Sequence, residues 1–257
     1  MNSEEYVFYS NPIASGLKKS FNNTVEYEEK DGIQYNKETG EQRTEESIKH
    51  SMYNSLNRTK QKIYDYALAN DWSNGYFLTI TFNQKFVDRY NYAECYKRIN
   101  TFLKILKRNN PDLKYLFVPE QHKDGAWHFH GLIVNCDNLI LIDSGKTSKG
   151  KKIYNIDSKT YKYGFTTATK IEDTNKVSAY ITKYITKELI ESTKGQHRYL
   201  FSKNLEVPTV TTEWVTDIND IELKKMLIER SERFQQKKVL GETESPNTIE
   251  YYRLRKK

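Results

Sequence analysis

The sequence predicts an α+β fold, in which helices pack on an antiparallel β-sheet. Short apolar strands and amphipathic helices alternate in the order β-α-β-β, and further strands and a helix follow. A turn signal, Asp124-Gly125, separates two consecutive strands, so these strands should run antiparallel. With 257 residues, the chain can form one large domain, or one domain with appendages, and bury a substantial core.

The N-terminal part of the chain is expected to form an appendage followed by one helix. Residues 1–42 contain turns and charge, as in VEYEEKDG and KETGEQ, but little hydrophobic periodicity. Over residues 43–69, apolar side chains return at helical spacings, which predicts a helix. We assign residues 1–70 to this appendage and helix, 71–216 to a main domain, and 217–257 to a C-terminal helix and basic tail.

The main domain should begin with a strand at 76–82, where YFLTITF lies between the turn residues SNG and NQK. An amphipathic helix is predicted at 91–109. Strands at 113–120 and 128–135 are joined by QHKDGAW. The remaining expected elements are strands at 138–143, 165–171, 198–203 and 208–214, a lysine-rich loop at 146–152, and helices at 174–191 and about 218–235.

The composition favours a nucleic-acid partner. The chain carries 41 Lys and Arg against 34 Asp and Glu, and it contains 20 Tyr and 11 Phe. Lysine can contact phosphates, and aromatic rings can stack on bases. Two cysteines are too few for a disulfide framework, and no apolar run reaches the roughly 18 residues of a membrane span. With no signal-peptide pattern at the N-terminus, the expected location is the cytoplasm.

Two histidines stand at the beginning of an apolar strand, in HFHGLIVN. Strand side chains alternate between faces, so His128 and His130 should point the same way. Glu120 ends the preceding strand, and the turn should bring it beside them as the third ligand of a divalent metal. His122, two residues further on, is the rival third ligand. The alternative is that the two histidines simply pack or form hydrogen bonds within the sheet.

The unit Tyr-Ile-Thr-Lys occurs twice in succession within AYITKYITKE. On one helix, Tyr180, Lys183, Tyr184 and Lys187 would share an arc of roughly 100°, while the neighbouring apolar arc docks on the sheet. The alternative is an ordinary amphipathic helix with solvated lysines. If the residues are catalytic, Tyr180 or Tyr184 would attack a phosphodiester polarised by the metal, and Lys183 and Lys187 would neutralise the phosphate charge.

Together these motifs resemble the HUH endonucleases, and within them the rolling-circle replication initiators of small phages and plasmids. YFLTITF resembles the first motif of that family, and HFH is similar to its His-hydrophobic-His motif. YITKYITK resembles the third motif in its two-tyrosine form. HRYLFSKNL also resembles plasmid and phage initiators. The resemblance covers about residues 76–204, roughly half of the chain.

The resemblance implies an RRM-like antiparallel sheet with the metal site on its central strands. It also implies Mg²⁺ or Mn²⁺ as the metal, and single-stranded DNA or an origin hairpin as the substrate. The stretch GKT at 145–147 lacks the first glycine of a P-loop, so a separate helicase would have to unwind duplex DNA. Candidate DNA contacts are Trp127, Lys146, Lys149, Lys151 and Lys152, although Trp127 could instead pack on the sheet.

Two other functions remain open from the sequence. Within the same chemistry, the chain could be a transposase or a plasmid-transfer relaxase. In a different class, it could be a non-catalytic RRM-like protein whose aromatic side chains stack on bases. Metal dependence separates the classes, because a binding protein should not need Mn²⁺.

Overall fold

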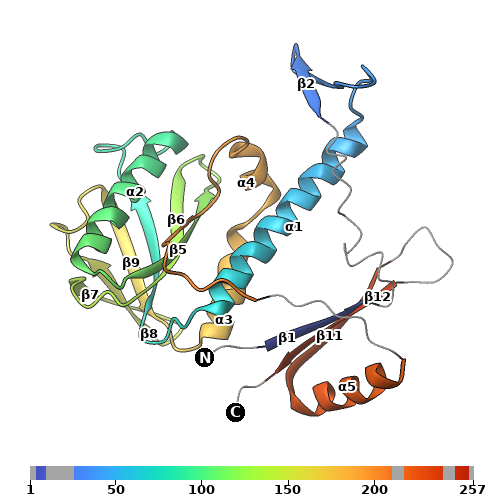
Figure 1. Ribbon diagram of the computed structural model, residues 1–257. Coiled ribbons are helices and arrows are strands. Elements are labelled where there is room, and N and C mark those ends of the chain that lie inside the picture. Colours follow the sequence, from blue (N-terminus) through green and yellow to red (C-terminus); the bar gives the residue numbers. More distant parts are fainter. Residues whose placement is uncertain (1–3, 10–25, 210–216, 240–246, 255–257) are drawn as a thin grey trace. The chain divides into compact units, whose positions relative to one another are not determined.

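The structure is a computed structural model that describes residues 4–9, 26–209, 217–239 and 247–254 (Figure 1). The chain divides into two compact units. The larger unit comprises residues 48–208, and the smaller unit combines residues 1–47 with residues 209–257.

A seven-stranded sheet forms the centre of the larger unit, in the order β10-β5-β6-β4-β9-β8-β7. Every pair of neighbouring strands is antiparallel. The predicted α+β class with an antiparallel sheet is therefore confirmed. The strands are β4 (Tyr76–Phe82), β5 (Lys114–Gln121), β6 (Trp127–Val134), β7 (Leu141–Ser148), β8 (Lys151–Ile156), β9 (Gly164–Lys170) and β10 (Leu200–Phe201).

Helices pack on both faces of this sheet. Figure 1 shows α2 (Tyr92–Asn109) on one side of the sheet, and α3 (Thr174–Ile181) and α4 (Lys187–Ser192) on the other. The helix α2 begins at Asn91, whose side chain accepts a hydrogen bond from the Glu94 N–H. Its apolar face is buried in the same core as Phe82 and Phe129, which alternate with the polar residues of their strands. The opposite sheet face carries the histidines.

The helix predicted at 174–191 is not continuous. It consists of α3 (Thr174–Ile181), a single 3₁₀ turn η1 (Thr182–Tyr184) and α4 (Lys187–Ser192). Ile185 and Thr186 adopt extended backbone angles, and the Thr186 side chain accepts a hydrogen bond from the Leu189 N–H. β-Branched residues favour helix interiors less than unbranched ones, and threonine is a good N-cap, so the chain begins a new helix here.

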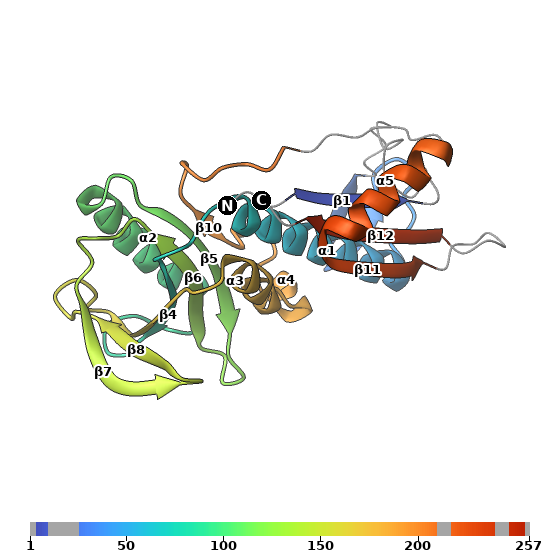
Figure 2. The ribbon, with the colours of Figure 1, turned by 90° about the horizontal axis from the view of Figure 1, so that it is seen from below.

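The lysine-rich segment predicted as a loop is a β-hairpin. β7 pairs with β8, and Ser148 lies opposite Lys151. Lys149 and Gly150 form the two-residue turn, with φ values of 49° and 77°. Positive φ at both positions is typical of a type I′ turn, whose twist suits antiparallel strands. Seen from below in Figure 2, this hairpin stands at the edge of the sheet away from α4.

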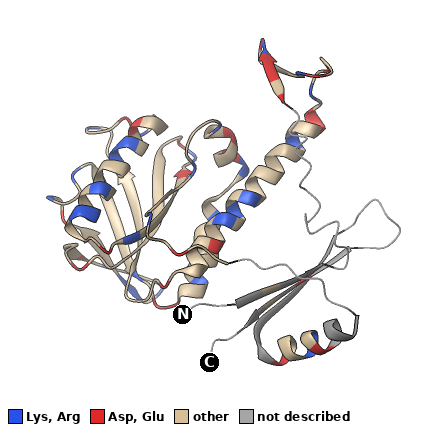
Figure 3. Cartoon of the chain, in the orientation of Figure 1, with Lys and Arg blue, Asp and Glu red and all other residues tan. Residues whose placement is uncertain are grey.

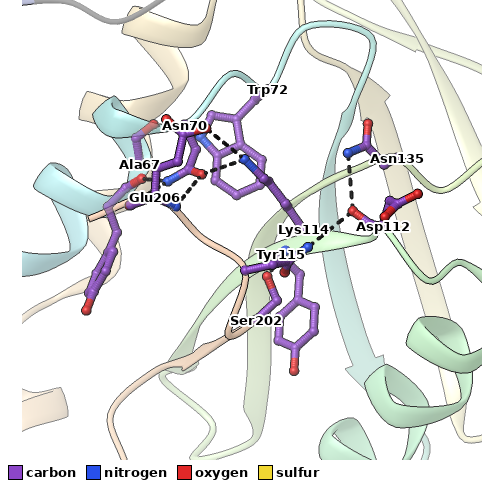
Figure 4. Close-up of polar contacts among 11 residues, drawn as sticks. Ala67, Asn70, Trp72, Asp112, Lys114, Tyr115, Asn135, Ser202 and Glu206 are labelled. Carbon is purple, nitrogen blue, oxygen red and sulfur yellow. Dashed lines mark hydrogen bonds and ion pairs between the residues drawn. The ribbon is translucent and has the colours of Figure 1, made fainter. Parts of the chain in front are cut away.

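The helix α1 (Glu45–Ala69) matches the predicted helix, and its C-terminal end is tied to the segment that follows β10. Asn70 is fully buried, and its side chain uses all its hydrogen-bonding capacity. It donates to the carbonyls of Tyr66 and Glu206 and accepts from the Glu206 N–H and the Lys114 ammonium (Figure 4). The segment after β10 is therefore part of the structural framework of the larger unit.

The described residues of the smaller unit form a three-stranded sheet and a helix. Strand β12 (Asn247–Leu254) lies between β1 (Glu4–Tyr9) and β11 (Ser231–Val239), and α5 spans Asp217–Arg230. A separate hairpin is formed by β2 (Tyr27–Lys30) and β3 (Ile33–Asn36).

The smaller unit differs from the sequence-based expectation in two ways. The helix expected to reach residue 235 ends at Arg230, and residues 247–254 of the expected basic tail form β12, which pairs with β1. The division into separate segments 1–70 and 217–257 did not foresee this pairing. Residues 210–214 of the expected strand 208–214 lie outside the described residues.

Candidate active site

Pairing between three strands gathers the predicted site on one face of the sheet. Glu120 of β5 lies opposite His128 of β6. On the other side of β6, Thr81 of β4 lies opposite His128, and Thr79 lies opposite His130. Cross-strand partners project to the same face, so the carboxylate, both imidazoles and both hydroxyls lie together.

Hydrogen bonds hold each imidazole in a defined orientation. The Thr81 Oγ1 atom lies 3.0 Å from His128 Nδ1, and the Thr79 Oγ1 atom lies 3.1 Å from His130 Nδ1. The other ring nitrogen of His130, Nε2, lies 2.7 Å from Glu120 Oε2. A hydroxyl can donate or accept, so each threonine can support either tautomer of its histidine.

Burial keeps both histidines uncharged. Desolvation lowers the pKa of His128 to about 4, and the neighbouring His122 and His130 act in the same direction. Desolvation also lowers the pKa of His130, against the opposing effect of Glu120. The hydrogen bond with His130 lowers the pKa of Glu120. At neutral pH the site therefore presents neutral imidazoles and a carboxylate, the protonation states that metal ligands require.

His122, the rival ligand, lies at the margin of this group. Its ring stacks on His128, with 4.0 Å between the ring centroids. Its Nε2 atom is 3.9 Å from Glu120 Oε2, the oxygen that contacts His130. The structure thus brings His122 next to Glu120 and His128 without a hydrogen bond to either of them.

The donor set can be compared with what a divalent metal requires. In the parts of the chain that the structure describes, no three His, Cys, Asp or Glu side chains are already arranged around a metal position. The chemistry of the donors nevertheless suits Mg²⁺ or Mn²⁺, which accept carboxylate and imidazole ligands. The 2.7 Å between His130 Nε2 and Glu120 Oε2 is close to the roughly 3 Å that separates adjacent ligands of an octahedral Mg²⁺ ion. The threonine contacts at Nδ1 are typical of the hydrogen bonds that orient metal-bound histidines.

Two tyrosines adjoin the histidines, in contrasting environments. Tyr184 is 8% exposed, and its ring stacks on His130 with a centroid distance of 3.7 Å. Tyr180 is 44% exposed, and its ring packs edge-on against Phe77 of β4. The Tyr184 hydroxyl donates a hydrogen bond of 3.2 Å to the Tyr180 hydroxyl. Successive side chains are thus in contact, from Glu120 to His130, from His130 to Tyr184, and from Tyr184 to the exposed Tyr180.

The environment separates the acidities of the two tyrosines. Partial burial raises the pKa of Tyr180, but hydrogen bonds from Lys183 and Tyr184 and the charges of Lys183 and Lys149 outweigh it. The net pKa of Tyr180 is lower than that of an ordinary tyrosine. Desolvation, followed by the contact with Tyr180, raises the pKa of Tyr184 far above its ordinary value. Tyr180 therefore forms a phenolate more readily than Tyr184.

The two lysines of the repeat do not play equivalent structural roles. The Lys183 ammonium lies 3.6 Å from the centroid of the Tyr180 ring and 4.6 Å from that of Tyr184. Lys187 is the exposed first residue of α4, beyond the break in the helix. The expectation that all four residues share one helix face is wrong, because the extended residues before α4 redirect the chain.

The candidate DNA contacts also differ from one another. Trp127 is 3% exposed and packs against Tyr92, with 4.6 Å between ring centroids, so it is not available to stack on a base. Lys151 forms an ion pair with Glu172, and Lys152 forms one with Asp143.

The remaining candidates, Lys146 and Lys149, are exposed and form no ion pair with a described residue. Figure 3 shows Lys and Arg on other elements too, including α2. Charge alone therefore does not single out this hairpin, and its position beside the site must decide its role.

The sequence-based reasoning missed Phe77, Thr79 and Thr81. These three residues alternate within YFLTITF, in the same way that His128 and His130 alternate within HFH. The signal was therefore present, but the pairing of the two strands was needed to show which histidine each threonine contacts.

Comparison with known protein families gives a match over the central part of the chain. Residues 75–189 match a family model of replication-associated proteins, described as Replication-associated protein of the ORF2 type. This segment includes all three motifs on which the resemblance to replication initiators rested, and the match confirms the resemblance to replication-associated proteins. No curated protein and no solved structure matches the chain significantly. No helix within the described ranges is long and apolar enough to cross a membrane.

Proposed function

Since residues 75–189 match the family of replication-associated proteins, we propose that the protein initiates rolling-circle replication. In this proposal it nicks single-stranded DNA at a replication origin and later rejoins it, through a covalent phosphotyrosine. A role in replication follows from the family itself, whereas the nicking chemistry is inferred from the site. The protein would act in the cytoplasm of a bacterial host, and a separate helicase would open duplex DNA.

The residues of the site support a simple sequence of events. The Tyr180 phenolate attacks the phosphorus of the scissile phosphodiester, and a bond forms between the tyrosine oxygen and phosphorus. The bond from phosphorus to the 3′ oxygen breaks, and this oxygen takes up a proton from solvent to become a free 3′-OH. Lys183 stabilises both the phenolate and the negative charge of the phosphate. Attack by a 3′-OH on the phosphotyrosine reverses the step and reseals the strand without ATP.

A divalent metal would be held by Glu120, His128 and His130, with His122 as an additional neighbour. Such a metal supplies Lewis-acid stabilisation of the phosphate charge. The threonines at Nδ1 keep the imidazoles oriented for this role, and the Tyr184 ring covers one side of His130.

The single observation that carries the proposal is the placement of Tyr180. An exposed tyrosine hydroxyl with a lowered pKa lies one hydrogen bond from Tyr184, which in turn stacks on His130. A non-catalytic nucleic-acid-binding protein has no need for a hydroxyl with lowered pKa beside a carboxylate and two neutral imidazoles.

The experiment that tests the proposal is a denaturing gel. The protein is incubated with Mn²⁺ and single-stranded DNA from its own replicon, and a covalent protein–DNA band is expected. The band should disappear with EDTA and in a Tyr180→Phe/Tyr184→Phe double variant. DNA binding without an adduct, over a range of metals and origin sequences, would refute the nuclease and favour a non-catalytic binding protein.

A further inference from the structure

Phe165 is the most exposed aromatic side chain among the described large apolar residues, with 70% of its surface accessible. It lies near the start of β9, where Thr166 and Ala168 are buried on the α2 side of the sheet. Phe165 and the exposed Thr167 therefore project from the face that carries the histidines. Packing does not account for the ring, because so little of it is covered.

The register places Phe165 in the same row as the candidate site. Phe165 lies opposite Thr81, Thr81 lies opposite His128, and His128 lies opposite Glu120. Neighbouring strands are about 4.8 Å apart, so Phe165 and His128 are separated by roughly 10 Å across the sheet. This is close enough for one extended polynucleotide strand to contact both.

The opposite end of this face carries the other groups that a single strand of DNA would require. Tyr180 packs on Phe77, which lies four residues before Thr81 on β4, about 13 Å along the strand. Tyr154 of β8 lies opposite Ala168 of β9, which lies opposite Leu78, so the β7–β8 turn with Lys149 lies toward the Phe77 end of β4. The charge of Lys149 accordingly lowers the pKa of Tyr180. An exposed ring and a lysine without an ion pair to any described residue thus bound the face at its two ends, and exposed threonine lies between them.

We propose that Phe165 is a stacking platform for a base of single-stranded DNA whose backbone passes Lys149 and Tyr180. The inference rests on the proposed function, because it takes the DNA to be the strand that Tyr180 cleaves. A π-face accepts any base, so Phe165 supplies affinity and positioning for the strand without reading its sequence. The basic turn favours a polyanion over an apolar protein partner on this face.

The test measures binding separately from cleavage. Binding of a fluorescein-labelled, 2-aminopurine-containing single strand is measured in EDTA, so that no cleavage occurs. Phe165→Ala should weaken binding roughly tenfold, equivalent to about 1.4 kcal/mol, and should lose the quenching of 2-aminopurine. Phe165→Trp should retain both. The matched control is Ile105→Ala, which removes an exposed apolar side chain (42% accessible) from α2 on the other side of the sheet. Its binding should match that of the unaltered protein.

The outcomes distinguish this inference from the proposed function. If Phe165→Ala binds DNA as well as the unaltered protein, the platform is wrong, even where the covalent adduct forms normally. If Phe165→Ala instead changes the oligomeric state and leaves DNA affinity unchanged, the ring belongs to an interface between copies, and the inference fails. Weaker binding by Phe165→Ala supports the platform, even if no adduct is detected and the nuclease proposal falls.

Discussion

Tyr184→Phe and Tyr180→Phe should have very different effects on covalent DNA cleavage. Tyr184→Phe removes one hydroxyl and leaves the ring stacked on His130. That hydroxyl donates to Tyr180, and a hydrogen bond to a charged acceptor contributes about 1.5–3 kcal/mol. Tyr180 is 44% exposed, so solvent weakens the bond, and the lower value of about 1.5 kcal/mol applies.

This magnitude translates into a change in rate. About 1.4 kcal/mol corresponds to a tenfold change in the fraction of Tyr180 that is ionised, because one pKa unit has that free-energy equivalent. Tyr184→Phe should therefore form the adduct roughly tenfold more slowly at neutral pH, and the deficit should shrink as pH rises. Tyr180→Phe should form none, because the nucleophile is gone.

The assay is the single-turnover rate of adduct formation with Mg²⁺ and saturating DNA, between pH 6.5 and 9. Tyr154→Phe serves as the control, because Tyr154 is a partly buried tyrosine of β8 that packs on Tyr76 away from the histidines. If Tyr180→Phe forms the adduct at the normal rate and Tyr184→Phe forms none, the buried tyrosine is the one that attacks. The assignment by exposure and acidity would then be wrong.

Three further outcomes are expected. Asn70→Ala should lower the free energy of unfolding by about 3 kcal/mol in urea, since four hydrogen bonds of a fully buried amide are lost; a loss below about 0.5 kcal/mol would contradict this. Thr81→Val should weaken Mn²⁺ binding about tenfold by calorimetry while the circular dichroism spectrum stays the same, because His128 loses its orienting hydroxyl; unchanged affinity would exclude this role. Stability should fall on acidification from pH 6.5 towards 4, because the pKa of His128 is lowered to about 4 and the unfolded chain binds the proton first. In His128→Asn the urea midpoint should depend less on pH over that range. An unchanged pH dependence would argue against a neutral, buried His128.

Local patterns were sufficient for the strands that carry the site. The sequence predicted β4 at its observed bounds, and β5, β6 and α2 to within a residue or so, because alternation and helical periodicity are properties of neighbouring residues. The same alternation placed His128 and His130 on one face, and the Asp124-Gly125 turn brought Glu120 opposite His128. The placement of Glu120, His128 and His130 depends on the eleven consecutive residues 120–130, so the chain determines it by itself.

Other features depend on contacts between distant parts of the chain. Tyr184 lies in η1 and is buried against His130, and Tyr180 lies in α3 and is exposed, whereas periodicity made the two tyrosines equivalent. Which threonine supports which histidine, and that Phe165 belongs to the same row, follow from the pairing of β4 with β6 and β9. Sequence alone identified the chemical groups of this site. Tertiary structure decided their exposure, acidity and partners, because desolvation and hydrogen bonding depend on which distant segments pack around each group.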